Sequence, residues 1–354
     1  MYQQELNKVN DTACFEEHFN DVKLQFILVL PVHQSSGELD EEAVRYPEQL
    51  ADKSFDNTGL LLESPFNFAK QQNNSVLLTI DLTRAVADEA IERGDSIIIA
   101  YHPIIFRGFK SLTLSDPQQD SLLRLAQNGI SVYSPHTAVD SVPGGMADWL
   151  LDIVTGPEGI SGDQISHTRS IIHPEINPPP GFENAGMGRI AKLEKPGQLQ
   201  SIINRLILKL DKPSGIPVAL PQGKRIHEMT NIRTIATCPG SGSSILMNNR
   251  KPVADVLVTG EMSHHDALAA IENRAVVISV FHSNSERGYL RAVMQPKLEA
   301  ALRGEWDAVR AEEACSLEGN DRDRYLRDWL SDAIFTVSVS ERDQDPYEVR
   351  AKED

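Results

Sequence analysis

The chain contains few cysteines, and they are poorly placed for cross-linking. Its 354 residues include only Cys14, Cys238 and Cys315, an odd number spread over the whole length. Such a set is not a disulfide framework, which favours a reducing intracellular compartment. We therefore expect a cytoplasmic protein, with mitochondrial and nuclear locations left open.

Long apolar runs and an excess of basic residues are also missing. The longest apolar stretch, residues 26–32, is far shorter than the roughly 20 residues of a membrane-spanning helix. The formal net charge is −17, which argues against an electrostatic nucleic-acid binder. The start of the chain is acidic rather than rich in arginine and predicts neither a signal nor a transit peptide. We expect no membrane association and no direct nucleic-acid binding.

A regular alternation of strand-like and helix-like segments begins near residue 46. Hydrophobic residues make up 40% of the chain and charged residues 24%, as in ordinary soluble globular proteins. Strands are predicted at 75–81, 96–102, 130–136, 188–193, around 218, 232–238, 255–259, 275–282 and 335–340. Helices are predicted at 83–93, 117–128, 145–154, 199–210, 263–273, 286–302 and 322–330. Strands that alternate with helices at this spacing indicate βαβ units and an α/β fold with largely parallel or mixed sheets.

Composition divides the chain into four stretches. Residues 1–40 lack periodicity and are expected to be an atypical leader. Residues 41–155 form a predicted N-terminal α/β lobe, and residues 189–354 a C-terminal one. Residues 156–188 are rich in proline and glycine and are expected to connect the two lobes.

Metal-ligating side chains follow three of the predicted strands. His102 and His136 each end a strand, with Asp140 four residues after His136, and His282 ends another strand, with Glu286 four residues on. The carboxyl ends of strands in an α/β sheet open into a common crevice. A lone histidine at a strand end is more often structural. The recurrence at three strand ends instead favours one transition-metal site with mixed nitrogen and oxygen ligands.

Three nearby features have more than one interpretation. Glu261 and His264, with His265 beside them, are interpreted as partners of the ligands, as substrate contacts or as helix caps. The Gly/Ser-rich segment 239–243 offers backbone amides to an anion or is a simple tight turn. Cys238 has no neighbouring base in the sequence and is interpreted as a small buried residue.

Several blocks together resemble a known family. They are Tyr46-Pro47-Glu48, Phe55-Asp56-Asn57-Thr58-Gly59-Leu60, Tyr101-His102-Pro103-Ile104-Ile105-Phe106, Ser134-Pro135-His136-Thr137-Ala138-Val139-Asp140, Gly186-Met187-Gly188-Arg189, Cys238-Pro239-Gly240-Ser241-Gly242, Thr259-Gly260-Glu261, His264-His265-Asp266-Ala267-Leu268 and His282-Ser283-Asn284-Ser285-Glu286-Arg287-Gly288. In this order they resemble the NGG-interacting-factor, or NIF-three-like, family, also catalogued as GTP cyclohydrolase 1 type 2.

The resemblance implies a two-lobed protein that assembles into a ring-shaped homohexamer, with a dinuclear metal site in the cleft between the lobes. Its metal residues map onto His102, Asp140, His282 and Glu286. This chain has Tyr101 where many relatives have a further histidine, and a tyrosine binds metal only as the phenolate. We therefore expect one secure ion, held by His102, Asp140 and Glu286, and a weaker second ion at His282 and a bridging Glu286. Mixed ligands of this kind suit zinc, iron or manganese.

Three functions are open at this point. The leading hypothesis is a metal-dependent, hydrolase-like protein that acts on a small molecule such as a nucleotide, with His136, Glu261 or His264 as proton-transfer groups. The second is a metal-binding scaffold or transcriptional co-regulator that acts through a regulatory protein partner. The third is the GTP cyclohydrolase reaction for which the family is catalogued.

Overall fold

The computed structural model describes residues 46–65, 73–156, 165–210, 215–316 and 334–349. The predicted leader (1–40) and the helix predicted at 322–330 lie outside these residues. The chain forms two compact units, each made from separate stretches of sequence. Of the described residues, the first unit contains 46–48, 57–65, 73–135, 291–316 and 334–343, and the second contains 49–56, 136–156, 165–210, 215–290 and 344–349.

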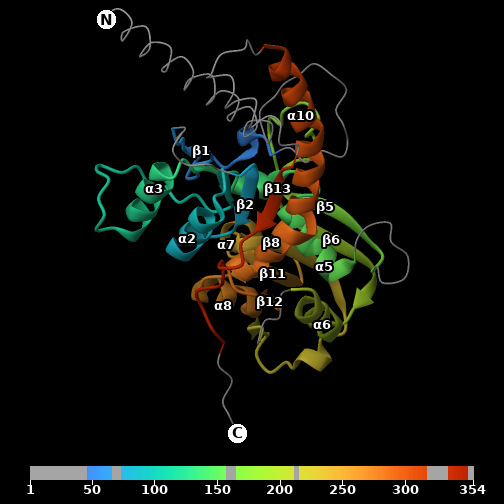
Figure 1. Cartoon of the computed structure of the whole chain (residues 1–354). Helices are drawn as coiled ribbons and strands as arrows, with labels where there is room; N and C mark the ends of the chain where they lie inside the picture. Colours follow the sequence, from blue (N-terminus) through green and yellow to red (C-terminus); the bar gives the residue numbers. More distant parts are fainter. Residues whose placement is uncertain (1–45, 66–72, 157–164, 211–214, 317–333, 350–354) are drawn as a thin grey trace, which may run out of the picture. The chain divides into compact units, whose positions relative to one another are not determined.

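The first unit is built on a five-stranded mixed sheet with the strand order β1-β4-β3-β2-β13 (Figure 1). Its strands are β1 (Gly59–Leu62), β2 (Ser75–Thr79), β3 (Ile97–Ala100), β4 (Ser131–Ser134) and β13 (Thr336–Val339). All neighbouring strands are parallel except β1, which pairs antiparallel with β4. The three central strands are fully buried, which explains why most of their residues are apolar.

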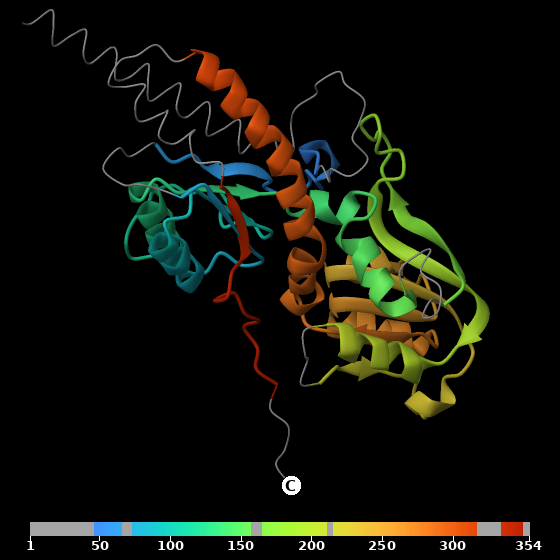
Figure 2. The ribbon, with the colours of Figure 1, turned by 45° about the vertical axis from the view of Figure 1, so that its right-hand side comes forward.

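Helices α2 (Arg84–Arg93) and α3 (Pro117–Gln127) pack against this sheet. The Oγ1 atom of Thr83 caps the start of α2, and Gly94, at φ 68°, ends it in the left-handed conformation. Asp116 caps α3, whose first residue is Pro117. A third helix, α10 (Gln295–Ser316), lies against β13 (Figure 2).

The second unit contains a six-stranded mixed sheet with the strand order β5-β6-β8-β11-β12-β7. The strands are β5 (His167–Pro174), β6 (Gly186–Gly197), β7 (Val218–Ala219), β8 (Ile232–Ser241), β11 (Val256–Glu261) and β12 (Val276–Ser279). The neighbours β8, β11 and β12 are parallel, while β5, β6 and β7 pair antiparallel. A short hairpin of β9 (Met247–Asn248) and β10 (Lys251–Pro252) lies outside this sheet.

Helices cover both faces of this second sheet (Figure 2). Helices α5 (Met146–Thr155) and α6 (Leu199–Lys209) pack their leucine and isoleucine side chains on one face. The short α7 (Ser243–Leu246) and α8 (His264–Glu272) pack on the other. Each helical layer buries one apolar face against the sheet, so the second unit is a three-layer α/β structure. The predicted α/β fold class, with mixed sheets, is therefore confirmed.

The predicted linker over 156–188 differs from what the structure contains. Residues 167–174 form β5, and β5 pairs with β6 as an antiparallel hairpin within the second unit. The run Pro178-Pro179-Pro180-Gly181 lies in the connection of this hairpin. Here proline and glycine lie in the turn between two strands. The sequence predicted a linker because both residues occur in hairpin loops as well as in longer connections.

The helix predicted at 286–302 is divided in the structure. A 3-10 turn (Ser283–Ser285), α9 (Arg287–Tyr289) and a π-helical segment (Leu290–Met294) precede α10, which begins at Gln295. Pro296 explains where the regular helix begins, because proline has no N–H to donate to the preceding turn and is tolerated in the first turn of a helix. Among the described residues, we find no helix with the length and apolar character needed to cross a membrane.

Gly145 provides a direct test of the packing just before α5. A Cβ atom at this position would lie 2.1 Å from the backbone oxygen of Val139 and 2.8 Å from that of Val142. Gly145→Ala should therefore lower the free energy of unfolding by about 1–3 kcal/mol, as overpacking typically does. Gly108→Ala is the control, since nothing lies within 4 Å of its added Cβ. Urea unfolding followed by circular dichroism measures both, and equal midpoints for the two variants would contradict the prediction.

Candidate metal centre

The carboxyl ends of three parallel strands bring the polar residues of the second unit together. In the register of β8, β11 and β12, Thr259 lies beside both Cys238 and Ser279. The segments that leave these strands therefore emerge at one edge of the sheet. Gly240 lies near the end of β8, Glu261 ends β11, and His282 follows β12.

His282 lies between two carboxylates at this edge. Its Nδ1 atom is 3.1 Å from Oε1 of Glu261, and its Nε2 atom is 3.5 Å from Oε1 of Glu286. The side chain of Glu286 is 1% exposed, whereas that of His282 is 39% exposed. An ionised carboxylate only accepts hydrogen bonds, so the bond to Glu261 places the proton of a neutral ring on Nδ1. The lone pair of Nε2 then faces the Glu286 carboxylate.

Two electron-pair donors that face each other at this distance suit a shared cation. A tetrahedral ion with nitrogen and oxygen ligands at about 2.1 Å separates two of those ligands by about 3.4 Å. The His282–Glu286 separation of 3.5 Å matches that spacing. A carboxylate that orients the other ring nitrogen is the usual companion of a metal-binding histidine. Glu261 has this position toward His282.

Glycines leave room for the pair. A Cβ atom on Gly240, which has φ 59°, would lie 2.7 Å from Oε1 of Glu286 and 3.0 Å from Nε2 of His282. A side chain here would therefore occupy the space beside the two donor atoms. The amide of Gly240 donates to Oγ of Ser285 at 2.8 Å, and that of Gly242 donates to the backbone oxygen of Glu261. Both amides are bonded to neighbouring segments of the protein, which favours the tight-turn interpretation over an anion site.

Asp140 lies in the second unit as well, on the short helix α4 (Thr137–Ser141), and is buried. Burial raises the pKa of the Cys238 thiol, and the negative charges of Asp140 and Glu286 raise it further. Both carboxylates therefore act on the same buried atom at the end of β8. The raised pKa keeps Cys238 protonated, in agreement with its interpretation as a small buried residue rather than a nucleophile.

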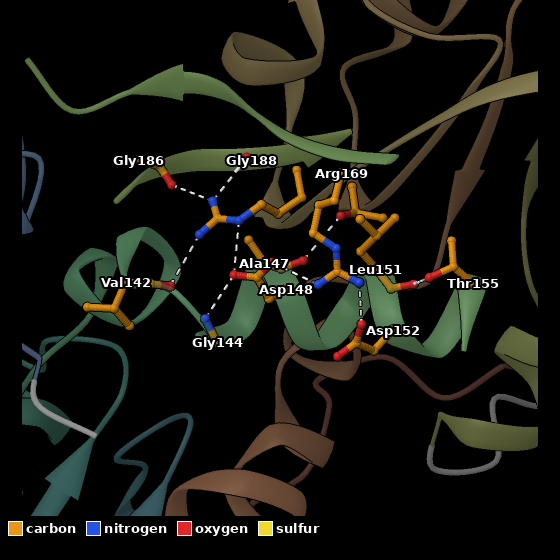
Figure 3. Close-up of polar contacts among 12 residues, drawn as sticks. Val142, Gly144, Ala147, Asp148, Leu151, Asp152, Thr155, Arg169, Gly186 and Gly188 are labelled. Carbon is orange, nitrogen blue, oxygen red and sulfur yellow. Dashed lines mark hydrogen bonds and ion pairs between the residues drawn. The ribbon is translucent and has the colours of Figure 1, made fainter. Parts of the chain in front are cut away.

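A buried arginine holds the end of α4 in place, and Figure 3 labels its partners Val142, Asp148, Gly186 and Gly188. The Nε atom of Arg189 pairs with Oδ2 of Asp148 at 3.0 Å. Its two other nitrogens donate to four backbone oxygens, those of Ser141, Val142, Gly186 and Gly188. Arg189 thus joins β6, α5 and the end of the helix that carries Asp140.

Arg169 extends this network along α5. It pairs with Asp148 at 3.0 Å and with Asp152 one turn further on (Figure 3). Sequence reasoning did not assign a role to Asp148, Asp152, Arg169 or Arg189. The one available signal was Arg189 itself, a charged residue directly after Gly-Met-Gly in a segment predicted to be a strand.

His136 directly precedes α4 and pairs with Asp56, which belongs to the same unit but lies far from it in the sequence. Its Nδ1 atom is 2.5 Å from Oδ1 of Asp56, and Oδ2 of Asp56 accepts the hydroxyl of Thr137. Burial alone would raise the pKa of Asp56, but the hydrogen bonds and positive charge from His136 and the bonds from Thr137 outweigh it and lower that pKa. His136 has a positive φ of 31°.

His102 belongs to the first unit and follows β3. Its Nδ1 atom is 2.9 Å from Oδ1 of Asp81. The ring of Tyr101, which is buried, lies 4.9 Å from the His102 ring. His102 therefore shares with His136 and His282 a carboxylate on Nδ1.

His264 and His265 occupy the exposed first turn of α8, where their rings contact each other. Ser263, and not Glu261 or His264, caps this helix by accepting the amide of Asp266. The helix-cap interpretation of Glu261 and His264 is therefore wrong. Glu261 contacts His282, which agrees with its interpretation as a partner of a metal ligand.

Comparison with known sequences identifies relatives over most of the chain. The family model described as Duf34/NIF3 (NGG1p interacting factor 3) matches residues 43–312. A protein named NIF3 homolog from Schizosaccharomyces pombe is 46% identical over 261 residues, which cover 73% of this chain and 87% of the relative. The NGG1-interacting factor 3 of Saccharomyces cerevisiae is 37% identical over 259 residues, covering 72% and 86% of the two chains.

Solved structures share the fold. The Bacillus cereus protein related to NIF3 has a TM-score of 0.59 and 19% identity, covering 86% of this chain and 96% of its own. Reduced HcgD from Methanocaldococcus jannaschii has a TM-score of 0.55 and 21% identity, covering 72% and 89%. At these identities the likeness supports the fold of the chain.

The Arg189 network predicts a large stability effect from one substitution. Arg189→Met removes a buried charge that pairs with Asp148 and leaves four backbone oxygens without their donor. Breaking a buried pair in this way costs about 3–5 kcal/mol. Arg342→Met, which removes an exposed pair with Glu92, should leave the urea midpoint close to the wild-type value. Similar midpoints for both variants would rule out the structural role of Arg189.

The lowered pKa of Asp56 predicts a specific pH dependence of stability. A carboxyl group whose pKa is lower in the folded state stabilises that state above its ordinary pKa of 3.8 and loses this contribution as the pH falls toward the lowered value. The difference in unfolding free energy between the wild type and Asp56→Asn should therefore be largest near pH 6 and shrink by pH 3. Urea unfolding at both pH values measures it. A difference that stays constant would contradict the assignment.

Proposed function

Since the chain belongs to the Duf34/NIF3 (NGG1p interacting factor 3) family, we propose that it is a metal-binding protein whose set of metal ligands includes Asp140, His282 and Glu286. The observation that carries this proposal is the arrangement around His282. Glu261 orients the ring from Nδ1 at 3.1 Å, and the buried Glu286 carboxylate faces Nε2 at 3.5 Å. The space beside both donors is kept by Gly240.

His102 is proposed as a further ligand of the same set. The sequence resemblance assigns it to the metal residues, and its bond to Asp81 leaves the lone pair of a neutral ring on Nε2. Tyr101 takes the place of a second histidine beside it and coordinates only as a phenolate. We therefore propose one firmly held ion and a second, weaker one, with zinc, iron and manganese as the candidates.

The chemistry that we propose for this site is hydrolysis of a small molecule, with nucleotides as the first class to test. A bound divalent ion would supply Lewis acidity and activate water near neutral pH. The chain itself would supply the proton-transfer groups, for which His136, Glu261 and His264 are the candidates. The contact of Glu261 with His282 favours a positioning role for that carboxylate.

A second candidate function is favoured by the name of a relative. The yeast relative, at 37% identity, is called NGG1-interacting factor 3, which describes an interaction with a protein. A metal-binding scaffold that acts through a regulatory partner fits this name and the net charge of −17. The predicted homohexamer would belong to either function.

Metal content tests the proposed centre directly. The purified chain, incubated with Zn²⁺ and freed of unbound ion, should retain at least about one ion per chain by elemental analysis. His282→Ala, Glu286→Gln, Asp140→Asn and His102→Ala should each lose much of it, while Glu261→Gln should weaken Zn²⁺ binding about 10- to 100-fold because it disturbs only the orientation of a ligand. His173→Ala, on the exposed part of β5, is the control. A wild-type chain without metal, or a His282→Ala variant with wild-type content, would refute the centre.

One set of incubations distinguishes the candidate functions from one another. Zinc- and manganese-loaded protein is tested against nucleotides and phosphoesters for hydrolysis, and against GTP for loss of the purine absorbance. Hydrolysis that disappears in His282→Ala supports the leading function, and loss of purine absorbance supports the cyclohydrolase reaction. If neither occurs while a partner is captured equally well by the wild type and His282→Ala, the scaffold function is favoured.

A further inference from the structure

Asp56 and His136 form a buried acid–imidazole pair outside the proposed ligand set. Oδ1 of Asp56 is 2.5 Å from Nδ1 of His136. The Asp56 side chain is 1% exposed, whereas the imidazole is 13% exposed, so the carboxylate is sealed while the ring still reaches solvent. From this geometry we infer that His136 transfers protons through its Nε2 atom, and that Asp56 is the positioning residue that holds it in the required tautomer. The inference rests on the proposed function, because it needs a substrate at the neighbouring Asp140.

Asp56 is held so firmly that it cannot turn away from His136. Its second oxygen, Oδ2, accepts the hydroxyl of Thr137 at 2.5 Å and the amide of Thr137 at 3.2 Å. The same Thr137 hydroxyl oxygen accepts the amide of Asp52 at 2.9 Å. Both carboxylate oxygens are thus occupied by donors from the start of α4. A carboxylate fixed in this way accepts only from the Nδ1–H tautomer of a neutral ring.

The backbone at His136 is in a costly conformation. Its φ of 31° and ψ of −120° lie in a region that residues with a Cβ atom rarely adopt. Strain of this kind costs on the order of 1–3 kcal/mol and occurs preferentially at functional sites. His136 makes no side-chain cap bond to α4, so capping of this short helix does not explain the conformation. The conformation instead delivers the ring to Asp56 and to the edge ring contact with Phe55.

The position of His136 relative to a proposed ligand fits proton transfer. His136 directly precedes α4, and Asp140 lies four residues further on, within the first turn of this helix, where each residue rises about 1.5 Å. A substrate that is bound at Asp140 would therefore lie within reach of the imidazole. By contrast, Glu261 is engaged with Nδ1 of His282, and His264 is exposed on α8. Among the three expected proton-transfer residues, His136 has the geometry of a general base.

The step that the pair would catalyse is the hydrolysis of a phosphoester or a related bond. Nε2 takes one proton from water while the water oxygen forms a bond to the electrophilic phosphorus. The phosphorus–leaving-group bond breaks, and the leaving oxygen receives that proton from Nε2–H. Asp56 stabilises the imidazolium that exists between the two transfers and remains ionised throughout.

The test combines a structural and a kinetic measurement on the full zinc-loaded chain. Protein labelled with ¹⁵N-histidine reports the protonated ring nitrogen by NMR, and His136→Gln identifies the signal. The neutral ring should carry its proton on Nδ1 in the wild type and in Thr137→Val, which keeps the Asp56–His136 pair. In Asp56→Asn a substantial fraction should shift to the Nε2–H tautomer, because an amide can also donate to Nδ1.

The kinetic arm uses bis(p-nitrophenyl) phosphate as the probe. Asp56→Asn and His136→Gln should retain the zinc content of the wild type but lose turnover by about 10²- to 10⁴-fold. Loss of zinc in His136→Gln would show that His136 is a ligand and would overturn the inference. Full turnover in Asp56→Asn, an Nε2–H tautomer in the wild type, or a zinc-loaded wild type without any turnover would overturn it as well. Absence of zinc from the wild type itself would instead refute the metal centre.

Discussion

A carboxylate on Nδ1 is the constraint that gives three histidines of this protein their chemistry. His102 pairs with Asp81, His136 with Asp56 and His282 with Glu261, at 2.9, 2.5 and 3.1 Å. Each bond places the proton of a neutral ring on one known nitrogen and leaves a lone pair on the other. The ring is also prevented from rotating. Whether such a ring binds a cation or moves a proton then depends on what Nε2 faces, and in His282 it faces the buried Glu286.

In the second unit, the backbone packs closely around the candidate site residues. Gly240 and Gly260 approach His282 so closely that a Cβ atom on either would lie within 3.0 Å of an atom of that residue. Arg189 holds the carboxyl end of α4 through the backbone oxygens of Ser141 and Val142. These contacts explain why the region combines small residues with a buried charge. Close packing leaves the donor atoms little freedom, which is what a ligand set needs in order to bind without rearrangement.

Local patterns predicted most of the regular elements. Helix α2 begins after Thr83 and ends at Gly94, and α8 follows Ser263, because capping side chains and left-handed glycines act within a few residues. The buried strands β2, β3 and β4 were visible as apolar runs. The strands β1 and β5 were not predicted. Each owes its existence to pairing with a strand far along the chain or across a proline-rich loop, and such pairing leaves only a weak local pattern.

The sequence by itself determined the α/β class, the family and the residue types at the strand ends, His102, Asp140, His282 and Glu286 among them. These follow from periodicities and motifs that are carried by adjacent residues. Only the tertiary structure decided that Glu261 contacts His282, that Asp56 reaches His136 from 80 positions away, and that Arg189 is buried against Asp148. The reason is physical: a hydrogen bond between two side chains depends on their distance and direction in space, and folding alone brings together groups that the chain keeps apart.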